Sequence, residues 1–168
     1  NRKIIIDIRM LKYSGIGTYV DNLVYRVINS LEDYQFILLL NNTSDYTEFF
    51  KKIKHNNYKI IKINSDIYSI SEQIEIWYKI PKKHLVFWSP HYNIPILIRS
   101  KILVTIHDIY HRVDSSRSNF IKKVYSFIML NIIKFKKCNI ITVSNFTKNE
   151  ILNHTSINKS QIDVIYNG

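Results

Sequence analysis

Short apolar runs alternate with segments of helical periodicity along the chain, and this alternation limits the possible folds more than any other feature. Seven runs have the length and apolar character of buried strands: 3–8, 34–40, 59–63, 85–88, 101–106, 140–143 and 163–165. Five segments between them have helical spacing: 15–31, 46–54, 71–80, 119–137 and 146–153. Strands that alternate with helices in this way form parallel sheets. We therefore predict an α/β fold with a parallel sheet and helices on both faces.

The size and composition of the chain agree with one folded domain spanning residues 1–168. It is 46% hydrophobic, which excludes a disordered chain, and its single cysteine excludes a disulfide framework and a Cys-rich zinc site. Pro90 and Pro95 interrupt the most apolar uncharged stretch, so no transmembrane helix is predicted. The chain begins directly in a strand pattern, so we expect no signal peptide. It stops at a turn-like Asn167-Gly168 directly after a strand, and we expect it to be a fragment.

The net charge of +11 is concentrated in one part of the chain. Residues 76–149 contain 13 Lys and Arg but only two acidic residues, whereas the flanking segments are close to neutral. Such asymmetry favours an anionic partner, which could be nucleic acid, acidic lipid or a phosphorylated substrate. A soluble, lysine-rich surface explains the same excess without a partner. No recognised nucleic-acid-binding motif accompanies the charge, which makes nucleic acid the least favoured of these partners.

Polar residues follow several of the predicted strands directly. His91 comes shortly after the 85–88 strand, His107 and Asp108 follow the 101–106 strand, and Ser144 follows the 140–143 strand. In an open α/β sheet, ligands bind outside the carboxyl ends of the strands. We therefore predict that these side chains gather at one edge of the sheet. His107 and Asp108 could be a donor–acceptor pair for a sugar or a leaving phosphate, or a capping or core pair, and His91 alone is interpreted as a partly buried structural residue.

Gly15 and Gly17 lie in the loop between the first strand and the first helix, and only one other glycine exists in the chain. Glycine allows a close approach of the backbone to a ligand, and the N–H groups at a helix N-terminus favour an anion such as phosphate. A tight turn that simply begins the helix is the alternative. The loop lacks the third glycine of a dinucleotide fingerprint, and Asn41 rather than an acidic residue ends the second strand, which disfavours NAD.

A weak metal pattern and two further residues that could carry chemistry have simpler structural interpretations. His107, Asp108 and His111 resemble a metal site only weakly, because two histidines four residues apart ligate well on a helix and not in a loop after a strand. We therefore predict no metal. Cys138 has no identifiable base beside it and is interpreted as a core residue, and Asp7, within an apolar run, as a structural hydrogen-bond acceptor.

The 119–137 segment mixes lysines with apolar residues on one predicted helix face. At about 100° per residue, one face carries Lys122, Lys123, Ser126, Met129, Leu130, Ile133, Lys134 and Lys137. The opposite face carries Phe120, Val124, Phe127, Ile128 and Phe135. Lysines beside exposed apolar residues suit a helix on an anionic membrane surface. Packing of the mixed face on a neighbouring helix or domain is the alternative.

Five segments, in the right order, resemble the N-terminal half of the retaining glycosyltransferases with the GT-B fold, in the large group usually called group 1 or family four. The first is Asp7-Ile8-Arg9-Met10-Leu11 followed by Ser14-Gly15-Ile16-Gly17-Thr18-Tyr19, and the second is Phe87-Trp88-Ser89-Pro90-His91-Tyr92. The others are 104–108, which corresponds to the family's active-site histidine stretch, 141–148, and 162–168, which leads toward the hinge between domains.

The resemblance implies a Rossmann-like, acceptor-side domain whose C-terminal, donor-binding partner domain is absent from this chain. Gly15 and Gly17 would approach the donor diphosphate, and His107 would act as the catalytic residue near the transferred sugar. His91, Asp108 and Ser144 would line the cleft. The family requires no metal or other cofactor, and the nucleotide-sugar is its substrate. Because the family's paired glutamates lie in the second domain, we expect this chain alone to be inactive.

The resemblance also implies partners and a location. Similar family members often use GDP-mannose or related donors and act on glycans or lipid-linked acceptors in polysaccharide biosynthesis, at the cytoplasmic face of the membrane. The lysines 122, 123, 134 and 137 would then face an anionic membrane surface. Two other functions remain open from the sequence: a non-catalytic nucleotide- or anion-binding module, and a basic peripheral membrane-binding domain.

Overall fold

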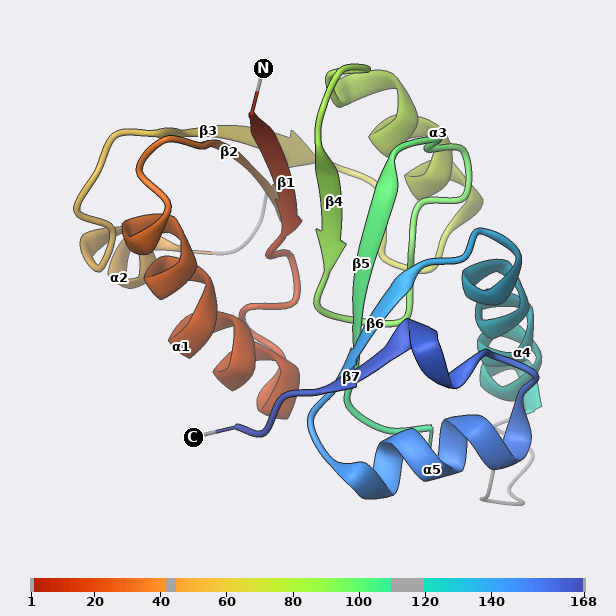
Figure 1. Cartoon of the computed structure of the whole chain (residues 1–168). Coiled ribbons are helices and arrows are strands. Elements are labelled where there is room, and N and C mark those ends of the chain that lie inside the picture. The colour runs from red at the N-terminus through yellow and green to blue at the C-terminus, as the bar shows by residue number, and fades with distance from the viewer. Residues whose placement is uncertain (1, 42–44, 110–119, 168) are drawn as a thin grey trace. The chain divides into compact units, whose positions relative to one another are not determined.

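The computed structural model describes residues 2–41, 45–109 and 120–167, with side chains omitted at 120–122. Backbone contacts divide the chain into two compact units. The first contains Asn1–Pro90 and Pro95–Lys101, and the second contains His91–Ile94 and Ile102–Gly168. Each unit is described by itself, and Figure 1 labels their helices and strands.

The first unit holds four parallel strands in the order β3-β2-β1-β4. The strands are β1 (Lys3–Asp7), β2 (Gln35–Asn41), β3 (Tyr58–Ile63) and β4 (Val86–Ser89). Ile5 in the central strand β1 aligns with Ile37 of β2 and with Phe87 of β4, and all three side chains are buried. Both edges of β1 are therefore covered by neighbours, which explains its uninterrupted apolar sequence.

Three helices cover this sheet: α1 (Ser14–Ser30), α2 (Thr47–Lys51) and α3 (Ile70–Lys79). The chain moves outward from β1 through β2 to β3 and then returns to β4 on the other side of β1. Because parallel crossovers are right-handed, α1 and α2 lie on one face and α3 on the other, as Figure 1 shows. The apolar residues of α1 that face the sheet, Val20, Val24 and Ile28, are fully buried.

The second unit holds three parallel strands in the order β5-β6-β7. They are β5 (Lys101–Ile106), β6 (Asn139–Thr142) and β7 (Ile162–Val164), and the helices between them are α4 (Phe120–Phe135) and α5 (Asn145–His154). The backbone of β7 continues the hydrogen bonding beyond the strand, because Ile165 N donates to Thr142 O. The short helix η3 (Lys159–Gln161) precedes β7.

The predicted α/β class is confirmed, and each predicted strand and helix is present. Most helices and strands begin and end within one or two residues of their predicted bounds. The main exception is α2, which ends at Lys51 and not at the predicted Lys54. Ser69 caps α3 by accepting from Glu72 N, and Pro81 follows the end of that helix as its sequence predicts. The helix η3 was not predicted, although its capping box of Asn158 and Gln161 is a recognisable signal. No helix among the described residues is long and apolar enough to cross a membrane.

Candidate functional site

The two glycines after β1 have different surroundings. A Cβ atom on Gly17 would lie 2.3 Å from Leu11 O and 3.1 Å from Met10 O, so the backbone packing there excludes any side chain. A Cβ atom on Gly15 would meet nothing within 4 Å. Gly17 is therefore required by the fold itself, whereas the backbone of Gly15 is open for the approach of a ligand.

The amino end of α1 has no internal group to neutralise it. Its N-cap, Tyr13, makes no side-chain hydrogen bond to the helix, and the first turn contains no acidic residue. The partial positive charge of the helix dipole and the first N–H groups are thus available at the surface beside Gly15. Next to them is a hollow of about 370 Å³, lined by 11–14, 17–18, Asp21, 48–49 and Lys52. An uncapped helix terminus favours an anion, and the lining of the hollow also includes the carboxylates of Asp21, paired with Lys52, and Glu48, paired with Lys51.

A buried ion-pair network fixes the backbone that leads into this loop. Arg9 Nε donates to Asp7 Oδ1 at 2.8 Å, and Arg9 Nη2 donates to Asp7 Oδ2 at 2.6 Å and to Glu72 Oε1 at 2.5 Å. Asn41 reaches the same segment through its Nδ2, which donates to Arg9 O. The network ties β1 to α3, and Asp7 is the structural acceptor that the sequence suggests.

In the second unit, Ser144 is linked to the backbone of His107 through one side chain. Ser144 caps α5 by accepting from Thr147 N at 3.1 Å, and Thr147 Oγ1 donates to His107 O at 2.9 Å. Since the Thr147 hydroxyl proton is used there, the 3.0 Å contact between the two hydroxyls has Ser144 as donor. Ser144 and Thr147 therefore fix the position of His107, whose side chain is partly exposed, and the neighbouring Asp108 is exposed.

His91 is a buried residue of the second unit. Its Nδ1 accepts from Asn93 N at 3.2 Å, and its ring lies against Tyr92 with the centroids 4.1 Å apart. Asn93 Oδ1 in turn accepts from the hydroxyl of Tyr125 on α4. This setting supports a structural contribution of His91 to the loop after β4.

The exposed face of α4 is the opposite of the expected one. Met129, Leu130 and Ile133, which were expected among exposed lysines, are at most 2% exposed and pack into the unit. The exposed apolar residues come from the other predicted face: Val124, Phe127, Ile128 and Phe135. Their burial agrees with the alternative that the mixed face packs on neighbouring parts of the protein, and it contradicts an exposed apolar surface formed by these three residues among the lysines. Lys134 and Lys137 are exposed, Lys123 is partly exposed, and the side chain of Lys122 lies outside the described residues.

Two other predictions concern reactive groups. Cys138 is buried, and burial raises the pKa of its thiol to about 11, which agrees with its interpretation as a core residue. Within the described ranges, no three His, Cys, Asp or Glu side chains are placed to share a metal ion. His111, the third residue of the weak metal pattern, lies outside the described part of the chain.

The structure thus brings Ser144 and His107 together in the second unit, while Gly15 and Gly17 belong to the first. Two residues that organise these places were not predicted. Arg9 was quoted only as part of a motif, although a cation two residues after a buried Asp is a usable signal for an internal ion pair. Thr147 was likewise quoted only as part of a motif, the 141–148 segment, and its contact with His107, 40 residues away, was not predicted.

Comparisons with known proteins identify the family. One solved structure with a similar backbone is a short chain dehydrogenase family protein from Francisella tularensis subsp. tularensis SCHU S4, at 10% identity and a TM-score of 0.45, which covers 95% of this chain and 79% of that one. A likeness of that size carries no functional argument. No curated protein sequence matches the chain. The family model for Glycosyltransferase Family 4 matches residues 13–168, which include the Gly15 loop, His107 and Ser144. The chain is therefore a member of Glycosyltransferase Family 4, with the Rossmann-like N-terminal domain of the GT-B fold.

Proposed function

We propose that this protein is the acceptor-side domain of a retaining glycosyltransferase that transfers a sugar from a nucleotide-sugar to a glycan or a lipid-linked acceptor. Membership of the family supports sugar transfer in general. The observation that carries the more specific proposal is the open backbone of Gly15 at the uncapped amino end of α1. A diphosphate is the part of a nucleotide-sugar that such a helix terminus favours.

In the proposed reaction, each residue has a limited task. The N–H groups around Gly15 stabilise the negative charge that develops on the leaving diphosphate, which lowers the barrier to breaking the sugar–phosphate bond. His107 contacts the transferred sugar and is the proposed catalytic residue, and Ser144 and Thr147 keep its backbone in place. A second, donor-binding domain would hold the nucleotide and exclude water when it closes.

A matched pair of glycine variants tests the role of the loop. In Gly15→Val the new side chain enters open space, so the free energy of unfolding should change by less than about 1 kcal/mol, while turnover of the complete gene product falls at least tenfold. In Gly17→Ala the Cβ meets Leu11 O, so the stability itself should fall. Turnover of Gly15→Val equal to the wild type would contradict diphosphate binding at this loop.

The assay compares the complete gene product with this chain over a panel of nucleotide-sugars that begins with GDP-mannose. We expect transfer by the complete gene product, loss of most of it in His107→Ala with the fold intact, and no transfer by this chain alone. Transfer by this chain alone would show that no second domain is needed. Nucleotide binding without transfer by either protein would favour the non-catalytic binding module.

We further propose that the protein acts at an anionic membrane surface, with α4 as the contact. The exposed residues Val124, Phe127, Ile128 and Phe135 form an apolar strip on this helix, and Lys134 is exposed at its margin. Apolar side chains beside lysines suit the boundary between acyl chains and anionic headgroups. The lysines lie beside the strip and would contact the anionic headgroups. The buried Met129, Leu130 and Ile133 anchor the helix to its own unit.

A further inference from the structure

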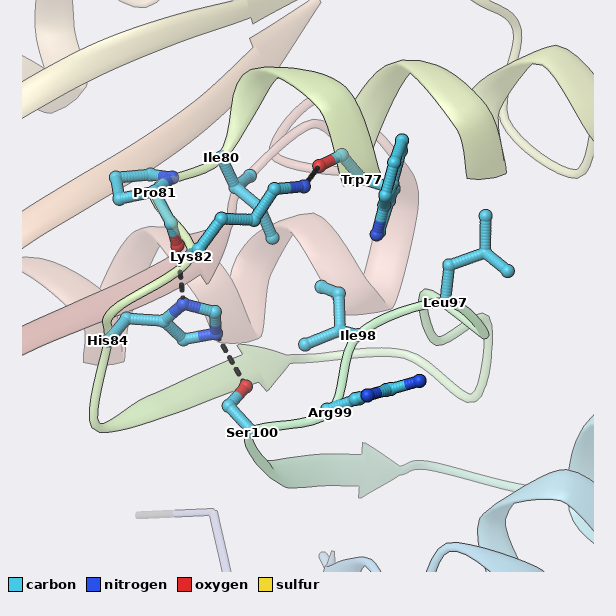
Figure 2. Close-up of a pocket in the computed structure, with 9 residues that line it drawn as sticks. All are labelled: Trp77, Ile80, Pro81, Lys82, His84, Leu97, Ile98, Arg99 and Ser100. Carbon is cyan, nitrogen blue, oxygen red and sulfur yellow. Dashed lines mark hydrogen bonds between the residues drawn. The ribbon is translucent and has the colours of Figure 1, made fainter.

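A second pocket lies in the first unit, between the end of α3 and the segment that leads into β5 (Figure 2). Its volume is about 510 Å³, which is within the usual range for small-molecule sites, roughly 300–1,000 Å³. The lining residues come from 77–84 and 97–100. Residues 77–84 precede β4 and residues 97–100 precede β5, whereas the Gly15 loop follows β1, which is a parallel neighbour of β4. The pocket is therefore at the amino ends of the strands, and the Gly15 loop is at their carboxyl ends.

The walls of the pocket are largely apolar. Ile80 and Ile98 form its inner part and are 4% and 3% exposed. Trp77 and Leu97 stand at the outer side, where they are 44% and 48% exposed. Figure 2 shows these side chains around the same space, with the ring of Trp77 and the chain of Arg99 on either side of Ile98. An apolar ligand would cover surface that the domain itself leaves in water.

Two cations stand at this apolar space without an acidic residue to neutralise them. Lys82 Nζ lies 3.8 Å from the centroid of the Trp77 ring and donates to Trp77 O, and Arg99 is exposed at the rim. The sequence has no acidic residue between Glu75 and Asp108, and within the described residues no carboxylate forms a salt bridge with Lys82 or Arg99. Both cations keep donors for an anion, because an ammonium has three and a guanidinium five.

His84 holds the two sides of the pocket in place. Pro81 O is only an acceptor, so His84 Nδ1 carries the proton and donates to it at 2.7 Å, and His84 Nε2 then accepts from Ser100 Oγ at 2.5 Å. Burial lowers the pKa of His84, which keeps the ring neutral at pH 7 and suits both hydrogen bonds. The link between Pro81 and Ser100 makes the pocket preformed, which reduces the entropy lost on binding.

We propose that this pocket binds an amphiphilic phosphate, with an alkyl chain against Trp77, Leu97 and Ile98 and the phosphate held by Lys82 and Arg99. Apolar walls select against a free inorganic anion, and two cations that form no salt bridge within the described residues select against a neutral or cationic amphiphile. A lipid phosphate in a membrane and a free alkyl phosphate share this chemistry. The proposal is independent of the sugar-transfer reaction, because its residues and its test involve neither the Gly15 loop nor His107.

The probe is octyl phosphate below its micellar concentration, measured by calorimetric titration of this chain and by tryptophan fluorescence. Trp88 is only 5% exposed, so the emission that responds to the ligand should come mainly from Trp77. We expect saturable binding of octyl phosphate, weaker binding at high salt, and at least tenfold weaker binding of octyl glucoside and of inorganic phosphate. In Lys82→Met/Arg99→Met the affinity for octyl phosphate should fall at least tenfold.

The matched control is Lys83→Met/Lys101→Met, which removes two lysines of the same region that do not line the pocket and should leave the affinity unchanged. Circular dichroism establishes that each variant is folded, and the single variants Lys82→Met and Arg99→Met replace the double variant if it is not. Equal binding of octyl phosphate and octyl glucoside, equal losses in the two double variants, or no saturable octyl phosphate binding would overturn the proposal. Given binding of octyl phosphate, a lipid source is identified if Lys82→Met/Arg99→Met binds phosphatidic acid vesicles more weakly than the wild type but binds phosphatidylglycerol vesicles equally well. Equal co-sedimentation of the variant and the wild type with phosphatidic acid vesicles identifies a free one.

Discussion

At the scale of single residues, Arg9 is an enclosed cation between two carboxylates. Its side chain is 1% exposed, and those of its partners Asp7 and Glu72 are 9% and 0% exposed. Burial acts to lower the pKa of Arg9, but Asp7 and Glu72 raise it further than burial lowers it. Arg9 Nη1 is buried and has no hydrogen-bond partner among the described atoms, so Asp7 and Glu72 are what compensate for the desolvation of this cation.

Replacing this cation should be costly. Arg9→Met leaves two buried carboxylates without their cation, and we expect the free energy of unfolding to fall by about 3–5 kcal/mol, measured by urea denaturation. Arg2→Met is the matched control, because Arg2 forms an exposed pair with Asp33 at 3.7 Å and should change the stability by less than about 1 kcal/mol. Equal effects of the two substitutions would contradict a structural role for the buried network.

At the scale of elements, Glu75 joins α3 to the end of β3 and gives the stability a pH dependence. Burial acts to raise its pKa, but hydrogen bonds from Lys79, Ser65 and Asn64 lower it to about 2 from the ordinary 4.5. The folded state therefore binds this proton less readily than the unfolded state. The stabilisation is complete above about pH 4.5 and is lost as the pH falls toward 2.

Glu75→Gln should remove about 1–2 kcal/mol of stability at pH 7, a value reduced for solvent screening of this partly exposed group, and much less at pH 3. The measurement is the urea midpoint from pH 7 to pH 3 for the variant and the wild type. Glu48→Gln, at an exposed surface pair with Lys51, is the control. A loss in Glu75→Gln that is the same at both pH values would contradict this account.

Some elements and contacts can be predicted from the sequence, and others depend on tertiary packing. The strand β5 is found at its predicted bounds, because a continuous apolar run has one favourable state in a parallel sheet. Which side of α4 is buried was not predictable in the same way, because apolar residues occupy both sides of the helix. Only tertiary packing decides that Ile133 is buried while Phe135 is 88% exposed. The Gly15 loop was predictable from local spacing. The Thr147 contact and the Trp77 pocket were not, because each joins segments distant in the sequence.

At the scale of the whole molecule, a sequence pI of about 9.6 and the basic segment 76–149 predict attraction to anionic surfaces. Charge alone does not specify a membrane, whereas the exposed strip of α4 adds an apolar surface, which suits the membrane contact proposed above. We therefore expect co-sedimentation with phosphatidylglycerol vesicles, weak binding to phosphatidylcholine vesicles, and weakening with salt.

The apolar part of this binding is tested by Ile128→Ser/Phe135→Ser, which should reduce vesicle affinity at least tenfold, since each buried apolar side chain contributes about 1.5–3 kcal/mol. Phe146→Ser is the control, because Phe146 is also a largely exposed aromatic residue, at 75%, but lies on α5 instead of α4. Lys82→Met/Arg99→Met distinguishes this surface from the Trp77 pocket, since it should leave phosphatidylglycerol binding through α4 in place. If Phe146→Ser lowers the affinity as much as the α4 variant, or if phosphatidylcholine binds equally well, then the strip of α4 is not a membrane contact and the basic segment 76–149 requires a different anionic partner.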